Sequence, residues 1–186
     1  MACDVRGKRI AATYMAAPTF DPAALAAYEA FRRETREQFD FLTRPTRRGG
    51  LGVDVQPSKV DPYLDAIAMT WDLLEHNRLK IYATGGPGNE HPLLTNGEND
   101  MFRAVHDAFG HAATGRGFDR HGEEAAWLKH GSMYSPLARK AMTTETRGQN
   151  STLIYRYNGL QFPEQKAFLL PDEFCDPENV TLRPTV

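Results

Sequence analysis

The fold is decided by one stretch of the chain, Phe102-Arg-Ala-Val-His-Asp-Ala-Phe-Gly-His-Ala-Ala113. Phe102, Val105 and Phe109 recur at helical spacing, which predicts a helix with one apolar stripe. A helix of this kind buries its stripe against a core. The same stretch holds two histidines, whose neighbours are too apolar for ordinary surface positions. It therefore predicts a core helix that also carries candidate metal-binding or catalytic side chains.

Similar periodicity predicts helices over much of the rest of the chain. They fall at 23–42, 63–77, 101–113, 122–130, 136–147 and 164–170, with short strands at 5–15, 53–55 and 79–84. Ile67, Trp71 and Leu74 form one stripe that we expect in the core, together with Trp127. Residues 177–186 are typical of an extended tail. The sequence predicts an α+β, mainly helical, single domain over residues 1–186, with a metal site between helices.

Composition narrows the class of function. The 186 residues are 41% hydrophobic with a formal charge of -2, which is typical of a globular protein and lacks a basic nucleic-acid footprint. No apolar run approaches the ~20 residues of a membrane span. We therefore expect a cytoplasmic protein with a small-molecule substrate, no nucleic-acid partner and no membrane. Nothing in the sequence indicates its oligomeric state.

Metal chemistry in this chain depends on histidines and carboxylates. Two cysteines, Cys3 and Cys175, are too few for a disulfide framework or a cysteine-based zinc site. Among the six histidines, His91 and His121 are expected in solvated loops. His76 and His130 are expected near the carboxyl ends of helices, where a positive side chain suits the dipole; this list leaves the two histidines of the core helix.

His106 and His111 are five residues apart, about 140° around an ideal helix of ~3.6 residues per turn. Gly110 weakens the helix just before the second histidine and lets the backbone distort or approach closely. Such a distortion places both imidazoles around one point. Alternatively, Asp107 and His111, four residues apart, supply the ligands and His106 supports them.

A site with two histidines needs a third ligand, and an open iron site favours a carboxylate. Glu145 lies among Thr144, Gln149 and Asn150, a polar composition that suits an interior hydrogen-bonding network. Glu123, by contrast, looks like part of the exposed first turn of a helix. We therefore choose Glu145.

The segment from His106-Asp-Ala-Phe-Gly-His111 to Thr143-Thr-Glu145 resembles the catalytic domain of the aromatic amino-acid hydroxylases. That family carries His-Glu-x-x-Gly-His on a helix and Thr-Val-Glu later. The resemblance covers residues 100–145; Asp107 stands where the family has glutamate, and Lys140 where it has tyrosine. It implies that His106, His111 and Glu145 bind Fe(II).

The resemblance further implies a mononuclear non-heme Fe(II) oxygenase that hydroxylates a small aromatic or ring-containing substrate with dioxygen. Its reductant, a pterin or another donor, is left open. Three protein ligands leave about three positions on an octahedral ferrous ion. We expect Asp107 to position a water or a cosubstrate, and Arg147, with Arg103, to bind an anionic substrate group.

Three rival interpretations fit parts of the same pattern. His106-Asp107 matches the dyad of HD-type metal-dependent phosphohydrolases. A zinc hydrolase uses the same three ligands to activate water. A non-enzymatic helical binding module needs none of this chemistry, and its histidines are core or surface residues.

Overall fold

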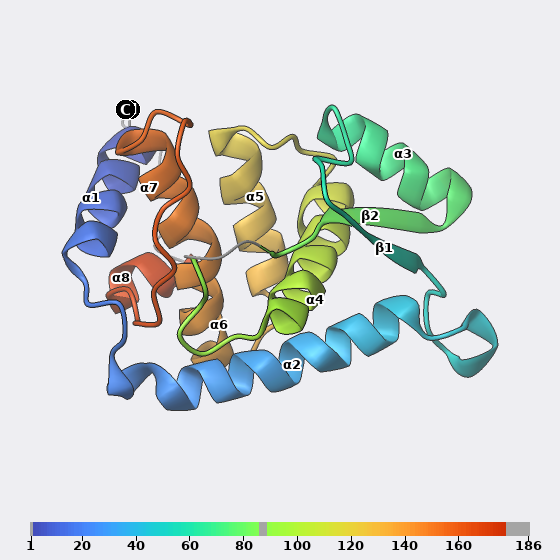
Figure 1. The fold of residues 1–186 in the computed structure, drawn as a ribbon, viewed down its shortest axis with the longest axis horizontal. Coiled ribbons are helices and arrows are strands. Elements are labelled where there is room, and N and C mark those ends of the chain that lie inside the picture. Colours follow the sequence, from blue (N-terminus) through green and yellow to red (C-terminus); the bar gives the residue numbers. More distant parts are fainter. Residues whose placement is uncertain (1, 86–88, 178–186) are drawn as a thin grey trace.

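The computed structural model describes residues 2–85 and 89–177, so the tail predicted at 177–186 lies almost wholly outside the described residues. Its helices and strands confirm an α+β, mainly helical class (Figure 1). The α-helices are α1 Ala2–Ala16, α2 Leu25–Thr43, α3 Ala66–His76, α4 Asn96–His106, α5 Arg120–Gly131, α6 Pro136–Thr143, α7 Gln149–Tyr155 and α8 Asp172–Cys175. The remaining elements are 3-10 turns η1 Pro22–Ala24 and η2 Thr46–Arg48, π-helical η3 Asp107–Ala112 and η4 Thr144–Gly148, and strands β1 Asp54–Ser58 and β2 Arg78–Tyr82.

The long helix α2 runs along one side of the molecule and contacts α4 and α6 (Figure 1). Asp21 caps the preceding turn, its side chain accepting a hydrogen bond from the backbone nitrogen of Ala23 at 2.9 Å. Tyr28, Phe31 and Leu42 then recur on one face and are buried. The helix predicted at 23–42 is therefore confirmed, and its apolar stripe lies in the main core.

Strands β1 and β2 pair in parallel, with Asp54 opposite Arg78 and Ser58 opposite Tyr82. Helix α3 connects them and packs against β2 and η3. Leu79 and Ile81 of β2 are buried beneath it. The strands predicted at 53–55 and 79–84 are confirmed, and their connection forms a βαβ unit.

Two predicted elements are wrong. Residues 5–15 form helix α1 rather than a strand. Ile10 and Tyr14, one helical turn apart, are both buried in a small apolar cluster with Phe168 and Leu170. Residues 164–170 contain no helix; a single parallel bridge joins Phe20 to Ala167 there. Short apolar runs do not distinguish helix from strand, so tertiary packing decides both.

The prediction that the stripe of α3 lies in the core is also wrong. Ile67, Trp71 and Leu74 are 79%, 63% and 75% exposed, whereas Met69 on the opposite face is buried. The side chain of Asp65 caps this helix by accepting from the nitrogen of Ala68 at 2.8 Å. The face of α3 that packs against the core therefore carries fewer large apolar residues than the exposed face. Trp127 of α5, in contrast, is buried as predicted.

Two helices continue through π-helical segments. Helix α4 passes without a break into η3, and α6 passes through η4 into α7, so the helix predicted at 136–147 extends to Tyr155. Each π segment coincides with residues that the sequence marks as candidate ligands, and π segments are frequent at functional sites. Within the part of the chain that the structure describes, no helix is long and apolar enough to span a bilayer.

Gly122, in the first turn of α5, is required by close backbone packing. A Cβ atom there would lie 1.8 Å from the carbonyl oxygen of Gly117. We predict that Gly122→Ala lowers the free energy of unfolding by about 1–3 kcal/mol, as overpacking does, in urea denaturation followed by circular dichroism. Gly97→Ala is the matched control, since a Cβ at Gly97 of α4 meets nothing within 4 Å. Equal stability of the two variants would contradict the assignment.

Candidate metal centre

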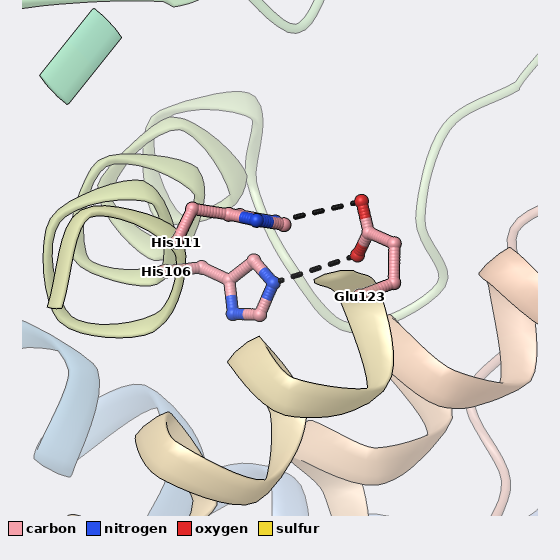
Figure 2. Close-up of side chains that lie close together, drawn as sticks. All are labelled: His106, His111 and Glu123. Carbon is pink, nitrogen blue, oxygen red and sulfur yellow. Dashed lines mark ion pairs between the residues drawn. The ribbon is translucent and has the colours of Figure 1, made fainter. Parts of the chain in front are cut away.

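The π-helical turn η3 brings His106 and His111 to the same side of one helix (Figure 2). In a π-helix the hydrogen bonds join residues i and i+5, so side chains five positions apart lie nearly above one another. The two imidazole rings are 5.1 Å apart between centroids and nearly perpendicular. The helix distortion expected from the spacing is confirmed.

Gly110 permits the close approach of α5 to this turn. A Cβ atom at Gly110 would lie 3.1 Å from the Cβ of Ala126 and 3.3 Å from Nδ1 of His106. A side chain here would therefore crowd Ala126 and His106, which would have to shift by a few tenths of an ångström. The glycine thus serves both the helix distortion and the contact between helices.

Glu123 of α5 is the carboxylate that faces the two histidines (Figure 2). Its Oε1 lies 3.5 Å from Nε2 of His111, and its Oε2 lies 3.8 Å from Nε2 of His106. The second separation is too long for a hydrogen bond. The three donor atoms lie within 4.8 Å of one another, and the side chain of Asn150 donates to Oε2 of Glu123. This carboxylate is therefore held at the position of a third ligand.

Hydrogen bonds behind His106 fix its tautomer. Nε2 of His130 lies 2.8 Å from the side-chain oxygen of Gln38, which only accepts, so that nitrogen donates. Burial lowers the pKa of His130 well below its usual value, so this imidazole is neutral and its Nδ1 accepts. Nδ1 of His106, 3.1 Å away, must then carry the proton. Nε2 of His106 faces Oε2 of Glu123, and in the neutral ring this nitrogen carries the lone pair.

That nitrogen is buried and has no hydrogen-bond partner among the described residues. A buried polar atom without a partner is costly, and most such atoms in native proteins are satisfied. In His111, Nδ1 donates to the carbonyl of Arg116 at 3.3 Å, so Nε2 is the nitrogen that faces Glu123, 3.5 Å from its Oε1. Both imidazoles therefore present Nε2 toward the same carboxylate.

Charge at the centre follows from these contacts. Burial raises the pKa of Glu123, but the imidazoles of His106 and His111 outweigh it and lower that pKa to about 2. Burial lowers the pKa of His111, but Glu123 outweighs it and raises that pKa above its usual value. Without a metal, the ionised carboxylate therefore favours a proton on the facing histidine.

The donor set fits a divalent transition metal. Imidazole nitrogen and carboxylate oxygen suit iron, zinc and manganese, and two ligands at ~2.1 Å from one ion are roughly 3.0–3.4 Å apart in tetrahedral or octahedral geometry. The separations of 3.5 and 3.8 Å are slightly longer. The three donor atoms, all within 4.8 Å of one another, would have to move closer together to bind one ion.

Glu145, chosen from the sequence as the carboxylate ligand, lies in a different network, and the structure places Glu123 beside the histidines instead. Tyr28 donates to Oε1 of Glu145, and Gln149 donates to Oε2 at 2.7 Å. His91 lies 3.0 Å from Oε1. The carboxylate thus has three donors of its own within the core, which explains its position.

His91 is buried rather than solvated as expected. Its Nδ1 accepts hydrogen bonds from the backbone nitrogens of Leu93 and Leu94 at 3.0 and 2.8 Å, so Nε2 carries the proton that it donates to Glu145. His130 lies in the last turn of α5, as expected, but it is buried and its lowered pKa keeps it neutral rather than positive. His91 contacts the carboxylate of Glu145, and His130 contacts His106 and Gln38.

Arg147, predicted to bind a substrate anion, has a structural role. Its guanidinium donates to both carboxylate oxygens of Glu124 and, at 2.6 Å, to the carbonyl of Phe174. It also lies 4.1 Å from the centroid of the Trp127 ring. These contacts occupy the buried guanidinium, so Arg147 joins η4 to α5 and α8. Arg103, its expected companion, donates to the backbone carbonyl of Tyr82.

Asp107 follows His106 but is outside the donor cluster. Burial raises its pKa to about 6, against the lowering effect of the nearby histidines. Its half-buried carboxyl accepts no side-chain or backbone hydrogen bond within residues 2–85 and 89–177. A role in positioning water or a cosubstrate stays a prediction for this residue.

The sequence does contain a signal for Glu123. Residues Glu123, Ala126, Trp127 and His130 follow the i, i+3, i+4, i+7 pattern of a single helix face. The last three are fully buried, and Glu123 is the end of that stripe. Treating it only as part of an acidic first turn hides this relation.

The coupling between Glu123 and the histidines predicts a pH-dependent stability. Because folding lowers the pKa of Glu123 from its usual 4.5, this carboxylate stabilises the fold above pH 4.5, and the stabilisation is lost as the pH falls toward 2. Because folding raises the pKa of His111 above its usual 6.5, this imidazole stabilises the fold below pH 6.5, and the stabilisation is lost at higher pH. In metal-free protein Glu123→Gln should therefore cost about 3 kcal/mol at pH 5.5 and less at pH 9, by urea denaturation with a chelator.

The exposed Glu37→Gln is the matched control and should change stability little at either pH. An effect of Glu123→Gln that is equal at pH 5.5 and pH 9 would contradict the pairing.

Comparisons of the chain with the models of known protein families, with curated proteins and with solved structures give no match. A function for this centre therefore rests on its geometry and on the chemistry of its side chains.

Proposed function

We propose that His106, His111 and Glu123 form a mononuclear two-histidine, one-carboxylate metal site, and that the protein is a non-heme Fe(II) oxygenase acting on a small substrate. The observation that carries the proposal is the buried, unpartnered Nε2 of His106, directed at Glu123. A metal ion would satisfy this lone pair. It would also replace the proton that Glu123 favours on His111.

The ligand types favour ferrous iron. Two histidines and one carboxylate with open positions form the facial arrangement of non-heme Fe(II) oxygenases. Bound iron would supply the activation of dioxygen. In a hydroxylation one oxygen atom enters a C–H bond of the substrate and the other leaves as water, so two electrons are required. A pterin or another reductant must supply them.

The chain's own residues would orient the ligands and shape the surroundings. Asn150 holds the carboxylate of Glu123, and His130 holds the ring of His106. The half-exposed ring of Phe118 meets the ring of His111 edge-on, 4.9 Å between centroids, and provides an apolar surface beside the centre. Asp107 provides a carboxyl group next to the histidines.

The rival functions receive different support. An HD-type site uses adjacent histidine and aspartate as ligands, but the cluster formed by His106 contains Glu123 and not Asp107. This geometry does not favour a phosphohydrolase. A zinc hydrolase shares all three ligands with the proposed oxygenase, so metal identity and oxygen consumption separate the two. A binding module does not account for the convergence of three donors.

Metal analysis tests the ligand set. We expect protein reconstituted with Fe(II) without oxygen to retain about one equivalent of iron after desalting. His106→Ala, His111→Ala and Glu123→Ala should each lose most of it, because two protein donors hold the ion weakly. The matched control is Glu145→Gln, which should retain iron. Circular dichroism confirms that each variant is folded.

Full iron retention in the three folded ligand variants would overturn the proposed site. Loss of iron in Glu145→Gln together with retention in Glu123→Gln would restore the ligand set implied by the hydroxylase resemblance. For the activity, oxygen uptake by the iron-loaded protein, stimulated by a reductant and absent in Glu123→Ala, supports an oxygenase. Tight zinc binding with ester or phosphate hydrolysis and no oxygen uptake contradicts it.

The hydrogen bond from His106 to His130 should influence metal affinity from behind the ligand. We predict that His130→Phe weakens metal binding by about 10–100-fold, as the loss of an orienting partner typically does. Titration with Co(II), followed by its visible absorption, measures the affinity. The exposed His76→Gln is the control and should bind normally. Unchanged affinity in a folded His130→Phe variant would contradict the orienting role.

A further inference from the structure

Helix α3 lies at one end of the molecule (Figure 1). It carries a ridge of apolar side chains that are exposed to solvent. The ridge consists of Leu64, just before the helix, and Ile67, Trp71 and Leu74 along it. Their exposed fractions are 97%, 79%, 63% and 75%. Scattered apolar residues on a surface are ordinary, but Ile67, Trp71 and Leu74 share one helix face, and Leu64 adds an exposed side chain just before the helix.

From this ridge we infer that the protein self-associates, with α3 packing against α3 of a second copy in an antiparallel, two-fold arrangement. The inference is independent of the proposed metal centre. The ridge lies on the face of α3 that points away from β2 and η3, against which the helix packs. Within the described residues, nothing covers these four side chains.

The size of the ridge fits a modest dimer. A fully exposed large apolar residue offers on the order of 200 Å², so the four exposed fractions correspond to roughly 600 Å². That value is at the upper limit of the largest patch on a typical monomer. A standard interface buries about 800 Å² per partner, and the ridge supplies most of this. We therefore expect dissociation in the micromolar range rather than an obligate dimer.

The spacing of the ridge favours an identical partner. Ile67 and Trp71 lie about one helical turn apart, and Leu74 lies about one turn further along the same face. An antiparallel copy therefore sets Ile67 against the partner's Trp71, and brings Leu74 to the amino end of the partner's helix, which Leu64 precedes. The interface is isologous, so the same surface serves both copies and the assembly closes at two.

Charge argues against a membrane surface as the occupant. Helices that lie on membranes carry Lys and Arg on their polar face. Helix α3 has neither, and the acidic Asp65 and Glu75 stand near its two ends. The antiparallel arrangement opposes the helix dipoles favourably.

Solution mass tests the inference. The full chain at tens of micromolar should have about twice its monomer mass of 20.9 kDa by light scattering or sedimentation equilibrium. Ile67→Glu should be monomeric at the same concentration, since it places a charge within the seam. Leu160→Glu, at an 89% exposed position elsewhere, is the matched control and should stay dimeric. Iron retention should be normal in both variants, which separates this test from that of the metal site.

Tryptophan fluorescence supplies a second readout. Trp71 is exposed and Trp127 is buried, so dimer formation should shift the emission to shorter wavelength as concentration rises. Ile67→Glu should abolish that shift while retaining both tryptophans. A wild-type chain that is monomeric at 100 μM, or an Ile67→Glu variant with unchanged mass, would overturn the inference. Monomers that bind neutral phosphatidylcholine vesicles through Trp71 would also overturn it.

Cross-linking tests the antiparallel geometry. A mixture of Leu64→Cys and Leu74→Cys proteins should form the mixed disulfide between positions 64 and 74 faster than either variant links to itself. Mass spectrometry of the linked peptides locates the bond and excludes Cys3 and Cys175. Faster homotypic linking at both positions would contradict the antiparallel arrangement.

Discussion

The close approach of α5 to the π-helical turn at Gly110 is the contact on which the candidate site depends. A Cβ at Gly110 would lie 3.1 Å from the Cβ of Ala126, so glycine lets the two helices approach without crowding. The same approach sets Glu123 opposite the two imidazoles. Without this approach the carboxylate on α5 would lie away from the histidines of α4 and η3, and Nε2 of His106 would have no carboxylate opposite it.

Polar groups in the interior divide into two networks with different states of satisfaction. Glu145 accepts hydrogen bonds from Tyr28, His91 and Gln149, so its carboxylate is fully paired and serves the fold. Around Glu123 the pairing is incomplete, because His106 keeps a free nitrogen. Most buried polar groups in native proteins are paired, and the proposed metal ion would supply the missing partner.

Much of the fold follows from local patterns. The periodic stretches of α2, α4 and α5 predict their helices, and the short β-branched and aromatic runs predict β1 and β2. Patterns fail where burial depends on partners distant in sequence. The ridge with Trp71 has core-like spacing, yet a two-stranded sheet is too narrow to cover more than one face of α3. The ridge is therefore exposed despite its core-like spacing. His130, in turn, is buried because it packs against residues distant in sequence, such as Gln38.

By itself, the sequence determined the helical class, the pair of histidines and the need for a helix distortion at Gly110, because these depend on residue type and on spacing within one helix. Only the tertiary structure decided which carboxylate faces the pair. Glu123 and Glu145 are both acids at plausible distances along the chain, and spacing cannot rank them. The approach of α5 selects Glu123, while the hydrogen-bond donors around Glu145 hold that carboxylate in the core.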